Sequence, residues 1–165
     1  MTSEEVIAEF KNWKPKDCLE AEICCGIRLV PFAVGRGAYR DIYTIKGLPD
    51  LIVKFPKHSK AHSVGEIKAI RKILNSKTKY TELKKLMPTL LYSDLRTGVI
   101  IMPKYKKLVT KYDSLISDLV ESIVNLEWDE KVITTDVHYE NLGLDAKGRP
   151  VIIDLGYFTN EGHDF

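Results

Sequence analysis

The fold prediction for this chain depends on two segments, Thr135-Asp136-Val137-His138-Tyr139-Glu140-Asn141 and Asp154-Leu155-Gly156. Each follows a short apolar run that predicts a strand, Val132-Ile133 before the first and Val151-Ile152-Ile153 before the second. Residues 142–153 predict a hairpin between the segments, because a turn-forming run separates two apolar stretches. We expect this hairpin to bring Asn141 and Asp154 close together.

Three polar residues in these segments, Asp136, Asn141 and Asp154, suggest phosphoryl transfer. That reaction needs a carboxylate near the attacking hydroxyl and oxygen ligands for magnesium, which neutralises the phosphates. Each residue lies at a predicted strand boundary, where its side chain can be displayed. Turns also favour aspartate and asparagine, so a purely structural role is the alternative.

A turn containing two glycines lies earlier in the chain, at Gly35-Arg36-Gly37-Ala38-Tyr39-Arg40. A glycine lets backbone N–H groups approach a phosphate closely, because it has no Cβ and adopts unusual backbone angles. The turn lies between two predicted strands, whereas a dinucleotide-binding loop would open a helix. A tight hairpin without a ligand is the alternative explanation.

Lys54 ends an otherwise apolar strand, one strand after the glycine turn. A lysine at such a position can reach two phosphates, and it then needs a carboxylate to hold its side chain. Glu66 is the natural partner, because its neighbours on the same face of the helix predicted over 62–76 are apolar. Ser63 and Glu66 also resemble a capping box, so a capping role is the alternative. Glu82 is a weaker candidate partner.

The remaining elements predict an α+β protein that begins as an antiparallel meander. The predicted strands include 27–34, where Pro31 favours a sheet edge, followed by 41–46 and 51–55. The turn Gly47-Leu48-Pro49-Asp50 separates the last two. The predicted helices span 3–13, 62–76, 80–87 and 113–127, and a further hairpin spans 90–102.

The order of these motifs resembles that of the protein-kinase superfamily. The turn with Gly35, Gly37 and Tyr39 is similar to the family's glycine-rich loop, Gly-x-Gly-x-aromatic-Gly. Lys54 and Glu66 resemble its strand lysine and helix glutamate.

Three later motifs extend the resemblance over residues 34–156. Met102-Pro103-Lys104-Tyr105 resembles the hinge whose backbone meets the adenine. The spacing of Asp136 and Asn141 resembles the catalytic loop, and Asp154-Leu155-Gly156 resembles the metal-binding Asp-Phe-Gly. The layout is also similar to that of small kinase-like proteins of bacteriophages.

The resemblance implies a phosphotransferase that uses ATP and Mg²⁺. Lys54 would contact the α- and β-phosphates, with Glu66 fixing it in place. Asp136 would orient or deprotonate the acceptor hydroxyl, while Asn141 and Asp154 would hold the metal. The implied acceptor is a protein hydroxyl, including one of this chain itself, or a small molecule, and a serine or threonine of a protein is favoured over the small molecule.

The fold implied by the resemblance is a single two-lobed, minimal kinase-like domain over residues 1–165. Residues 1–103 would form an N-lobe with an extra N-terminal helix, and 104–165 a much reduced, helical C-lobe. Only nine residues follow Gly156, so the platform that binds peptide substrates in ordinary kinases is expected to be missing.

Three positions depart from the kinase pattern. Arg40 replaces the third loop glycine, where its cation would lie near the phosphates or face solvent. Thr134-Thr135 replaces the usual His-Arg. His138 gives the form Asp-x-His-x-x-Asn of aminoglycoside and other small-molecule phosphotransferases, and it would contact the transferred phosphate or serve a structural role.

A kinase-like module that inhibits or recruits a host protein is the alternative function, motivated by the many basic residues in the stretch 54–85. A net charge of +2 and the lack of a recognition motif argue against nucleic acid. No apolar run approaches the roughly 18 residues of a membrane span. The acidic, polar N-terminus and three cysteines expected as thiols (Cys18, Cys24, Cys25) predict a cytoplasmic location, the host's cytoplasm if the chain is viral.

Overall fold

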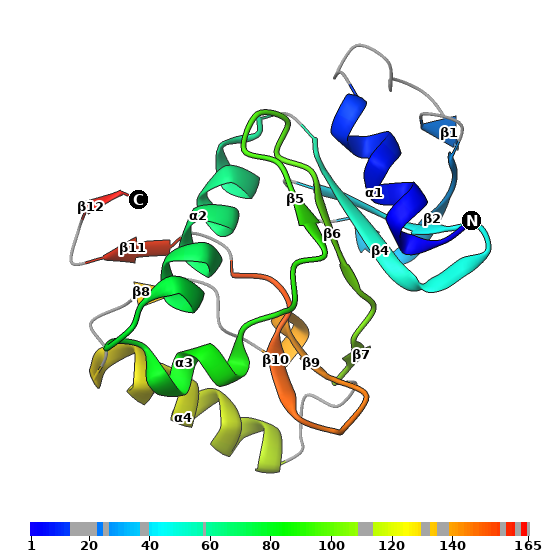
Figure 1. The fold of residues 1–165 in the computed structure, drawn as a ribbon. Coiled ribbons are helices and arrows are strands. Elements are labelled where there is room, and N and C mark those ends of the chain that lie inside the picture. The colour runs from blue at the N-terminus through cyan, green and yellow to red at the C-terminus, as the bar shows by residue number, and fades with distance from the viewer. Residues whose placement is uncertain are drawn as a thin grey trace. The chain divides into compact units, whose positions relative to one another are not determined.

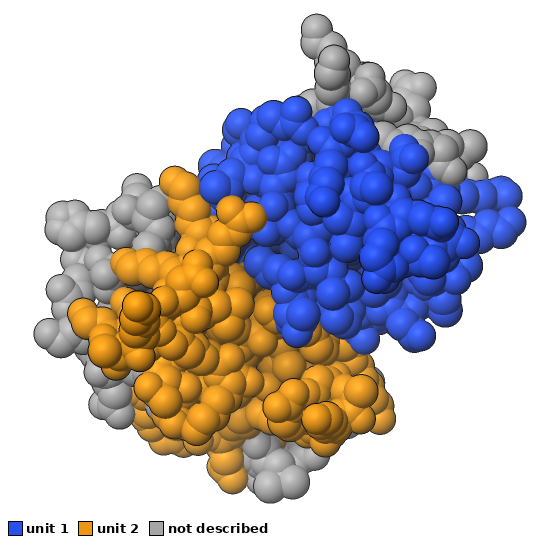
Figure 2. Space-filling model, viewed as in Figure 1, with its two compact units in different colours: residues 1–67, 89–104 blue, residues 68–88, 105–165 orange. Residues whose placement is uncertain are grey.

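A computed structural model describes residues 1–13, 23–24, 27–36, 40–57, 59–108, 114–129, 133–134, 139–155, 158–160 and 163–164 (Figure 1). The chain divides into two compact units (Figure 2). The first comprises Met1–Ile67 and Thr89–Lys104, and the second comprises Lys68–Pro88 and Tyr105–Phe165. The lobe boundary predicted after residue 103 lies beside the end of the first unit at Lys104, whereas residues 68–88 belong to the second unit.

The first unit contains a six-stranded antiparallel sheet with the order β1-β2-β3-β4-β6-β5. Its strands are β1 (Ile23–Cys24), β2 (Ile27–Arg36), β3 (Arg40–Ile45), β4 (Leu48–Pro56), β5 (Tyr92–Ser93) and β6 (Ile100–Pro103). The predicted meander and the later hairpin are therefore present. In the described part of the chain, β1 pairs with β2 only at Ile27 and Arg28, so Pro31 lies where β2 pairs with β3 alone.

The turn between β3 and β4 is shorter than predicted. It consists of Lys46 and Gly47, and β4 already begins at Leu48, so Pro49 and Asp50 belong to the strand. Gly47 has a φ of +87°, which a two-residue hairpin turn requires and which glycine adopts without strain.

Helix α1 (Ser3–Asn12) begins with a capping box formed by Thr2 and Glu5. The Thr2 hydroxyl accepts from the Glu5 N–H at 3.3 Å, and the Glu5 carboxylate accepts from the Thr2 N–H at 2.7 Å. Its buried residues share one core with the sheet. The core residues are Val6, Phe10, Trp13, Ile27, Leu29, Ile45, Val53, Val99 and Ile101. Because successive strand residues face opposite sides of a sheet, Val53 faces this core and Lys54 faces away from it.

Helix α2 (Ala61–Asn75) starts one residue earlier than predicted. The Ser59 hydroxyl accepts from the Ala61 N–H at 3.2 Å, so the serine that serves the helix start is Ser59. Ser63 lies inside the first turn and is fully buried. The prediction that Ser63 caps the helix is therefore wrong, because a capping residue must precede the first helical turn.

In its described residues, the second unit contains the end of α2, two further α-helices and two small sheets. Helix α3 (Thr81–Leu86) ends before Pro88, and α4 (Ser114–Asp129) matches the helix predicted over 113–127 except at its ends. One sheet has the order β10-β9-β7 and the other β12-β11-β8. Their strands are β7 (Lys106–Lys107), β8 (Ile133–Thr134), β9 (Leu142–Leu144), β10 (Pro150–Ile152), β11 (Phe158–Asn160) and β12 (His163–Asp164).

The predicted hairpin over 142–153 is confirmed by the antiparallel pairing of β9 with β10. A single 3₁₀ turn, η2 (Tyr139–Asn141), leads into it. Val132 and Asp113, at the starts of two predicted elements, lie outside the described residues. The architecture is α+β, as predicted, and no helix among the described residues is long and apolar enough to cross a membrane.

Candidate functional site

Lys54 is a buried cation in the middle of the first unit's sheet. It pairs with Ile42 on β3 and with Ile100 on β6, and its exposed fraction is 2%. A lysine is almost never buried to this degree without a charged partner, because an ammonium loses much hydration energy on leaving water. This position therefore needs a carboxylate nearby.

Glu66 supplies that carboxylate from α2. Lys54 Nζ donates to Glu66 Oε1 at 3.1 Å, and Glu66 is 1% exposed. The predicted ion pair is confirmed, and the alternative capping role for Glu66 is wrong, since Ser63 is not the N-cap. Glu82, the weaker candidate, is exposed on α3 and pairs with Lys85 at 2.6 Å.

Arg40 adds a second cation to the same carboxylate. Its Nη1 forms an ion pair with Glu66 Oε2, and the residue is 6% exposed. Of the two environments considered for Arg40 from the sequence, solvent is therefore excluded. The signal that could have found the pair is strand alternation, because Arg40 lies two residues before Ile42, the ladder partner of Lys54.

The three charged side chains form one buried cluster, Arg40–Glu66–Lys54. Removing water from such groups costs several kcal/mol per ion, and deleting one member typically costs about 3–5 kcal/mol because it leaves a buried charge without its partner. An apolar cluster of similar volume would often be no less stable. Buried charge clusters of this kind are therefore candidates for function.

In the second unit, the β9–β10 hairpin places Asn141 beside the residue that precedes Asp154. The Ile153 N–H donates to the Asn141 carbonyl at 2.7 Å, directly after the last ladder pair of Leu142 with Ile152. The hairpin thus brings Asn141 to the residue next to Asp154, and the proximity of the two side chains stays a prediction. Both residues are half-buried.

The turn of this hairpin is held by Asp145. Its carboxylate accepts from the Arg149 N–H at 2.9 Å, from the Arg149 Nε at 2.7 Å and from the Lys147 N–H at 2.8 Å. These bonds, led by that of the Arg149 backbone, lower the pKa of Asp145. Gly148, at φ +76°, supplies the positive φ of the turn.

Several predicted site residues lie elsewhere or outside the described residues. Gly35 lies in β2, whereas Gly37, Tyr39, Asp136 and His138 fall in parts of the chain that the structure does not describe, as do Cys18 and Cys25. Cys24 lies in β1.

The segment predicted as the hinge, Met102 to Tyr105, begins in the last two residues of β6 and extends beyond the strand. The Met102 side chain is fully buried, and its residue pairs with Ile52. The Lys104 N–H donates to the Asp50 carbonyl at 2.7 Å, so this N–H is engaged within the first unit. Tyr105, the first residue of this segment in the second unit, lies beside Gly143, where an added Cβ would come within 2.9 Å of the Tyr105 Cβ.

Comparison with known proteins assigns no family. No family model matches the chain, and no curated protein matches it. Among solved structures, the crystal structure of WbdD is similar, with 16% sequence identity and a TM-score of 0.45 over 74% of this chain and 31% of that chain. The chain thus spans about a third of the length of that structure.

Proposed function

We propose that this chain is an ATP- and Mg²⁺-dependent phosphotransferase of protein-kinase type, with a minimal two-lobed kinase-like fold. The observation that carries the proposal is the buried ion pair of Lys54 and Glu66, joining a central strand to α2. In this assignment Lys54 binds the α- and β-phosphates of ATP, and Glu66 holds the lysine in position.

The burial of Lys54 supports a binding role rather than a purely structural one. An apolar side chain in the middle of β4 would avoid the cost of desolvating two charges, and isosteric apolar replacement of buried ion pairs is often neutral or stabilising. The ammonium of a lysine presents three N–H donors, a geometry that suits the oxygens of a phosphate. The presence of charge here is explained by a ligand that needs it.

The donor atoms of Asn141 and Asp154 fit Mg²⁺. One offers an amide oxygen and the other a carboxylate, and Mg²⁺ prefers hard oxygen ligands. In proteins Mg²⁺ is usually held by one or two carboxylates together with water and substrate phosphates, so a dedicated protein cage is not needed. When bound, the metal would neutralise phosphate charge.

The remaining roles follow the resemblance. Asp136 would orient or deprotonate the acceptor hydroxyl, and His138 would contact the transferred phosphate. The loop with Gly35, Gly37 and Tyr39 would cover the phosphates, and the segment from Met102 to Tyr105 would meet the adenine. The proposed acceptor is a serine or threonine of a protein, including this chain.

The test is transfer of label from γ-labelled ATP, with Mg²⁺, to the chain itself and to proteins of a host extract. We expect wild type to transfer label, and Lys54→Met and Asp136→Ala to lose at least about 99% of the rate, since each removes stabilisation of the transferring group. Lys46→Met, at the exposed β3–β4 turn, is the matched lysine control and should retain wild-type activity. The proposal would be overturned if the wild-type protein showed no label transfer and no ATP turnover.

A second candidate function is a kinase-like module that recruits or inhibits a host protein. Its supporting observation is a group of exposed cations among residues 68–88 of the second unit. These are Lys68, Arg71, Lys72, Lys77, Lys79 and Lys85. Capture of one stoichiometric partner that persists in Lys54→Ala and Asp154→Ala would favour this function. Loss of that capture in both variants would favour the enzyme.

A further inference from the structure

Arg40 is the member of the buried cluster to which the proposed function gives no role. It begins β3 opposite Pro56, and Lys54 lies opposite Ile42 in the same ladder. Directly paired strand residues project to the same face of a sheet, as do residues two apart on one strand. Arg40 and Lys54 therefore lie on one face and reach Glu66 from neighbouring strands.

The two oxygens of Glu66 contact different cations. Lys54 Nζ donates to Oε1 at 3.1 Å, and Arg40 Nη1 pairs with Oε2. A single contact would leave the carboxylate free to turn about its last torsion, which has a broad energy well. Two contacts from separate strands fix both oxygens, and so fix the plane in which Lys54 is held.

The burial of Glu66 makes the second contact important for binding. Its exposed fraction is 1%, so water does not compensate its charge. If Lys54 were its main counter-ion, any shift of the ammonium toward a phosphate would weaken the pairing of a buried carboxylate, which is costly. An arginine suits the role of a permanent counter-ion, because its guanidinium stays protonated and presents its donors in a rigid fork.

We infer that Arg40 is a positioning residue for nucleotide phosphates: it holds and neutralises Glu66, so that Lys54 can share its charge with the bound nucleotide. The inference rests on the proposed function. It also gives a reason for an arginine at the position where the kinase pattern has a third loop glycine. At this position the chain has a permanently charged side chain instead of a glycine with its wider choice of backbone angles.

The experiment uses the full chain and the variants Arg40→Met, Arg40→Lys, Glu66→Gln and the double variant Arg40→Met/Glu66→Gln. Arg28→Met is the matched control, since Arg28 is an exposed arginine on β2 of the same sheet. The measured quantities are the Kd of Mg·ATP, the kcat and KM of ATP turnover, and the free energy of unfolding in urea without nucleotide. Circular dichroism checks that each variant is folded. If Arg40→Met does not fold, Arg40→Lys, which keeps the positive charge, is measured in its place.

We expect Arg40→Met to raise the Kd of Mg·ATP about tenfold, Arg40→Lys to restore part of the loss, and Arg28→Met to match wild type. The decisive result is non-additivity, because residues that act through one another do not have independent effects. In the Glu66→Gln background, Arg40→Met should change the Kd by less than about twofold.

Two results would overturn the inference about Arg40 but leave the proposed function standing. An unchanged Kd in folded Arg40→Met shows that the arginine does not serve binding, and a full tenfold loss in the Glu66→Gln background shows that it acts on the nucleotide without Glu66. Wild type that binds no Mg·ATP overturns the proposed function as well. In that case a coupling of Arg40 and Glu66 in the unfolding measurements would leave Arg40 with a structural role only.

Discussion

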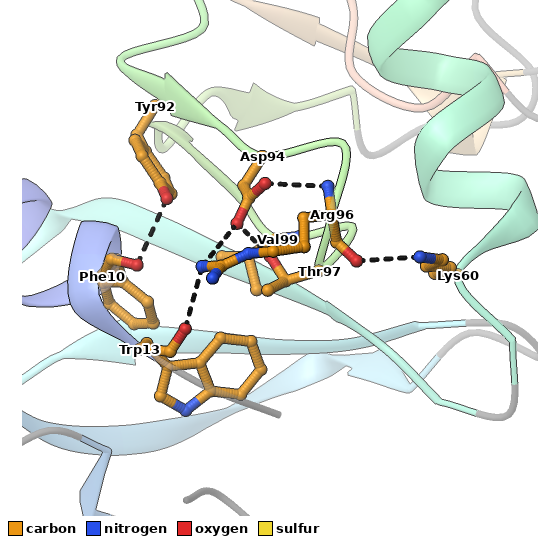
Figure 3. A network of polar contacts seen from close by, with 8 residues as sticks. All are labelled: Phe10, Trp13, Lys60, Tyr92, Asp94, Arg96, Thr97 and Val99. Carbon is orange, nitrogen blue, oxygen red and sulfur yellow. Dashed lines mark hydrogen bonds and ion pairs between the residues drawn. The ribbon is translucent and has the colours of Figure 1, made fainter. Parts of the chain in front are cut away.

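The Tyr92 hydroxyl donates to the Phe10 carbonyl at 3.2 Å and so ties the end of α1 to β5 across 82 residues of sequence (Figure 3). Arg96 makes a second tie, from its guanidinium to the Trp13 carbonyl at 3.1 Å. Lys60, just before α2, donates to the Arg96 carbonyl at 2.9 Å. The β5–β6 turn therefore connects the N-terminal helix and the start of α2 within the first unit.

These ties predict that α1 is an integral part of the first unit. Tyr92→Phe should lower the free energy of unfolding by about 1 kcal/mol, the value of one neutral hydrogen bond. Arg96→Met should lower it by about 1.5–3 kcal/mol, because it removes charge-assisted bonds to Trp13 and Asp94. Urea unfolding at constant m measures both.

The control for this pair is Leu95→Ala in the same turn. Leu95 is exposed, so its truncation should stay within about 0.5 kcal/mol of wild type. Equal urea midpoints for wild type, Tyr92→Phe and Arg96→Met would show that α1 does not depend on the turn.

Asp94, the acceptor in the same turn, predicts a loss of stability in acid. Partial burial raises the pKa of Asp94, but bonds from the Arg96 N–H, the Thr97 hydroxyl and the Arg96 guanidinium outweigh it, so the pKa lies below its usual value. The native state therefore binds the proton more weakly than the unfolded chain, in which an aspartate has a pKa of about 3.9. The contribution is complete above that pH and disappears as the pH falls through the lower native value.

The measurement is urea unfolding between about pH 5 and pH 2.5. Asp94→Asn should lower stability at pH 5 and lose stability less steeply in acid than wild type does. Asp50→Asn, at an exposed position of β4, should reproduce the wild-type slope. Parallel acid profiles for wild type and Asp94→Asn would contradict the prediction.

The sequence predicted those parts of the fold in which local pattern and tertiary packing agree. The strands around Lys54 alternate correctly, and Glu66 was found because a charged residue on an apolar helix face needs a buried partner. The predicted turn after β3 is longer than the observed one, because the run Leu48-Pro49-Asp50 resembles part of a turn. In the structure these residues begin β4, and Gly47 supplies the positive φ of the turn. Strands of two residues, such as β1 and β7, have no periodicity to detect.

Arg40, the member of the charged cluster that the sequence did not place there, illustrates the same limit of prediction from local pattern. Arg40 was assigned to a loop because the glycine motif extends over it, whereas it is the first residue of β3. Its partner Glu66 comes from α2, and only the three-dimensional structure brings the two together. Cap placement failed for a similar reason: Ser63 has the right type and spacing, but the helix starts earlier, at Ala61.

Gly143 predicts a packing limit in the second unit. An added Cβ would lie 2.9 Å from the Tyr105 Cβ, 3.0 Å from the Ile153 Cγ2 and 3.3 Å from the Lys106 carbonyl oxygen. Gly143→Ala should therefore lower the free energy of unfolding by about 1–3 kcal/mol, as overpacking does. Thermal unfolding measures the effect.

Gly65→Ala is the matched control, because nothing lies within 4 Å of the added Cβ. Gly65 lies inside α2, where alanine is favoured over glycine, so this variant should be up to about 1 kcal/mol more stable than wild type. A Gly143→Ala protein as stable as wild type would mean that β7 and β9 can move apart at no cost.

Asp154 predicts a magnesium requirement that can be separated from nucleotide binding. Asp154→Asn replaces a carboxylate by an amide and removes the charge that a hard divalent cation prefers. We expect the Mg²⁺ concentration that half-saturates ATP turnover to rise at least about tenfold, while binding of ATP in EDTA stays within about twofold of wild type. Glu140→Gln makes the same chemical change at an exposed residue next to Asn141, and it should leave the Mg²⁺ requirement as it is in wild type. An equal shift in both variants would mean that the general negative charge near η2, rather than ligation by Asp154, attracts the metal.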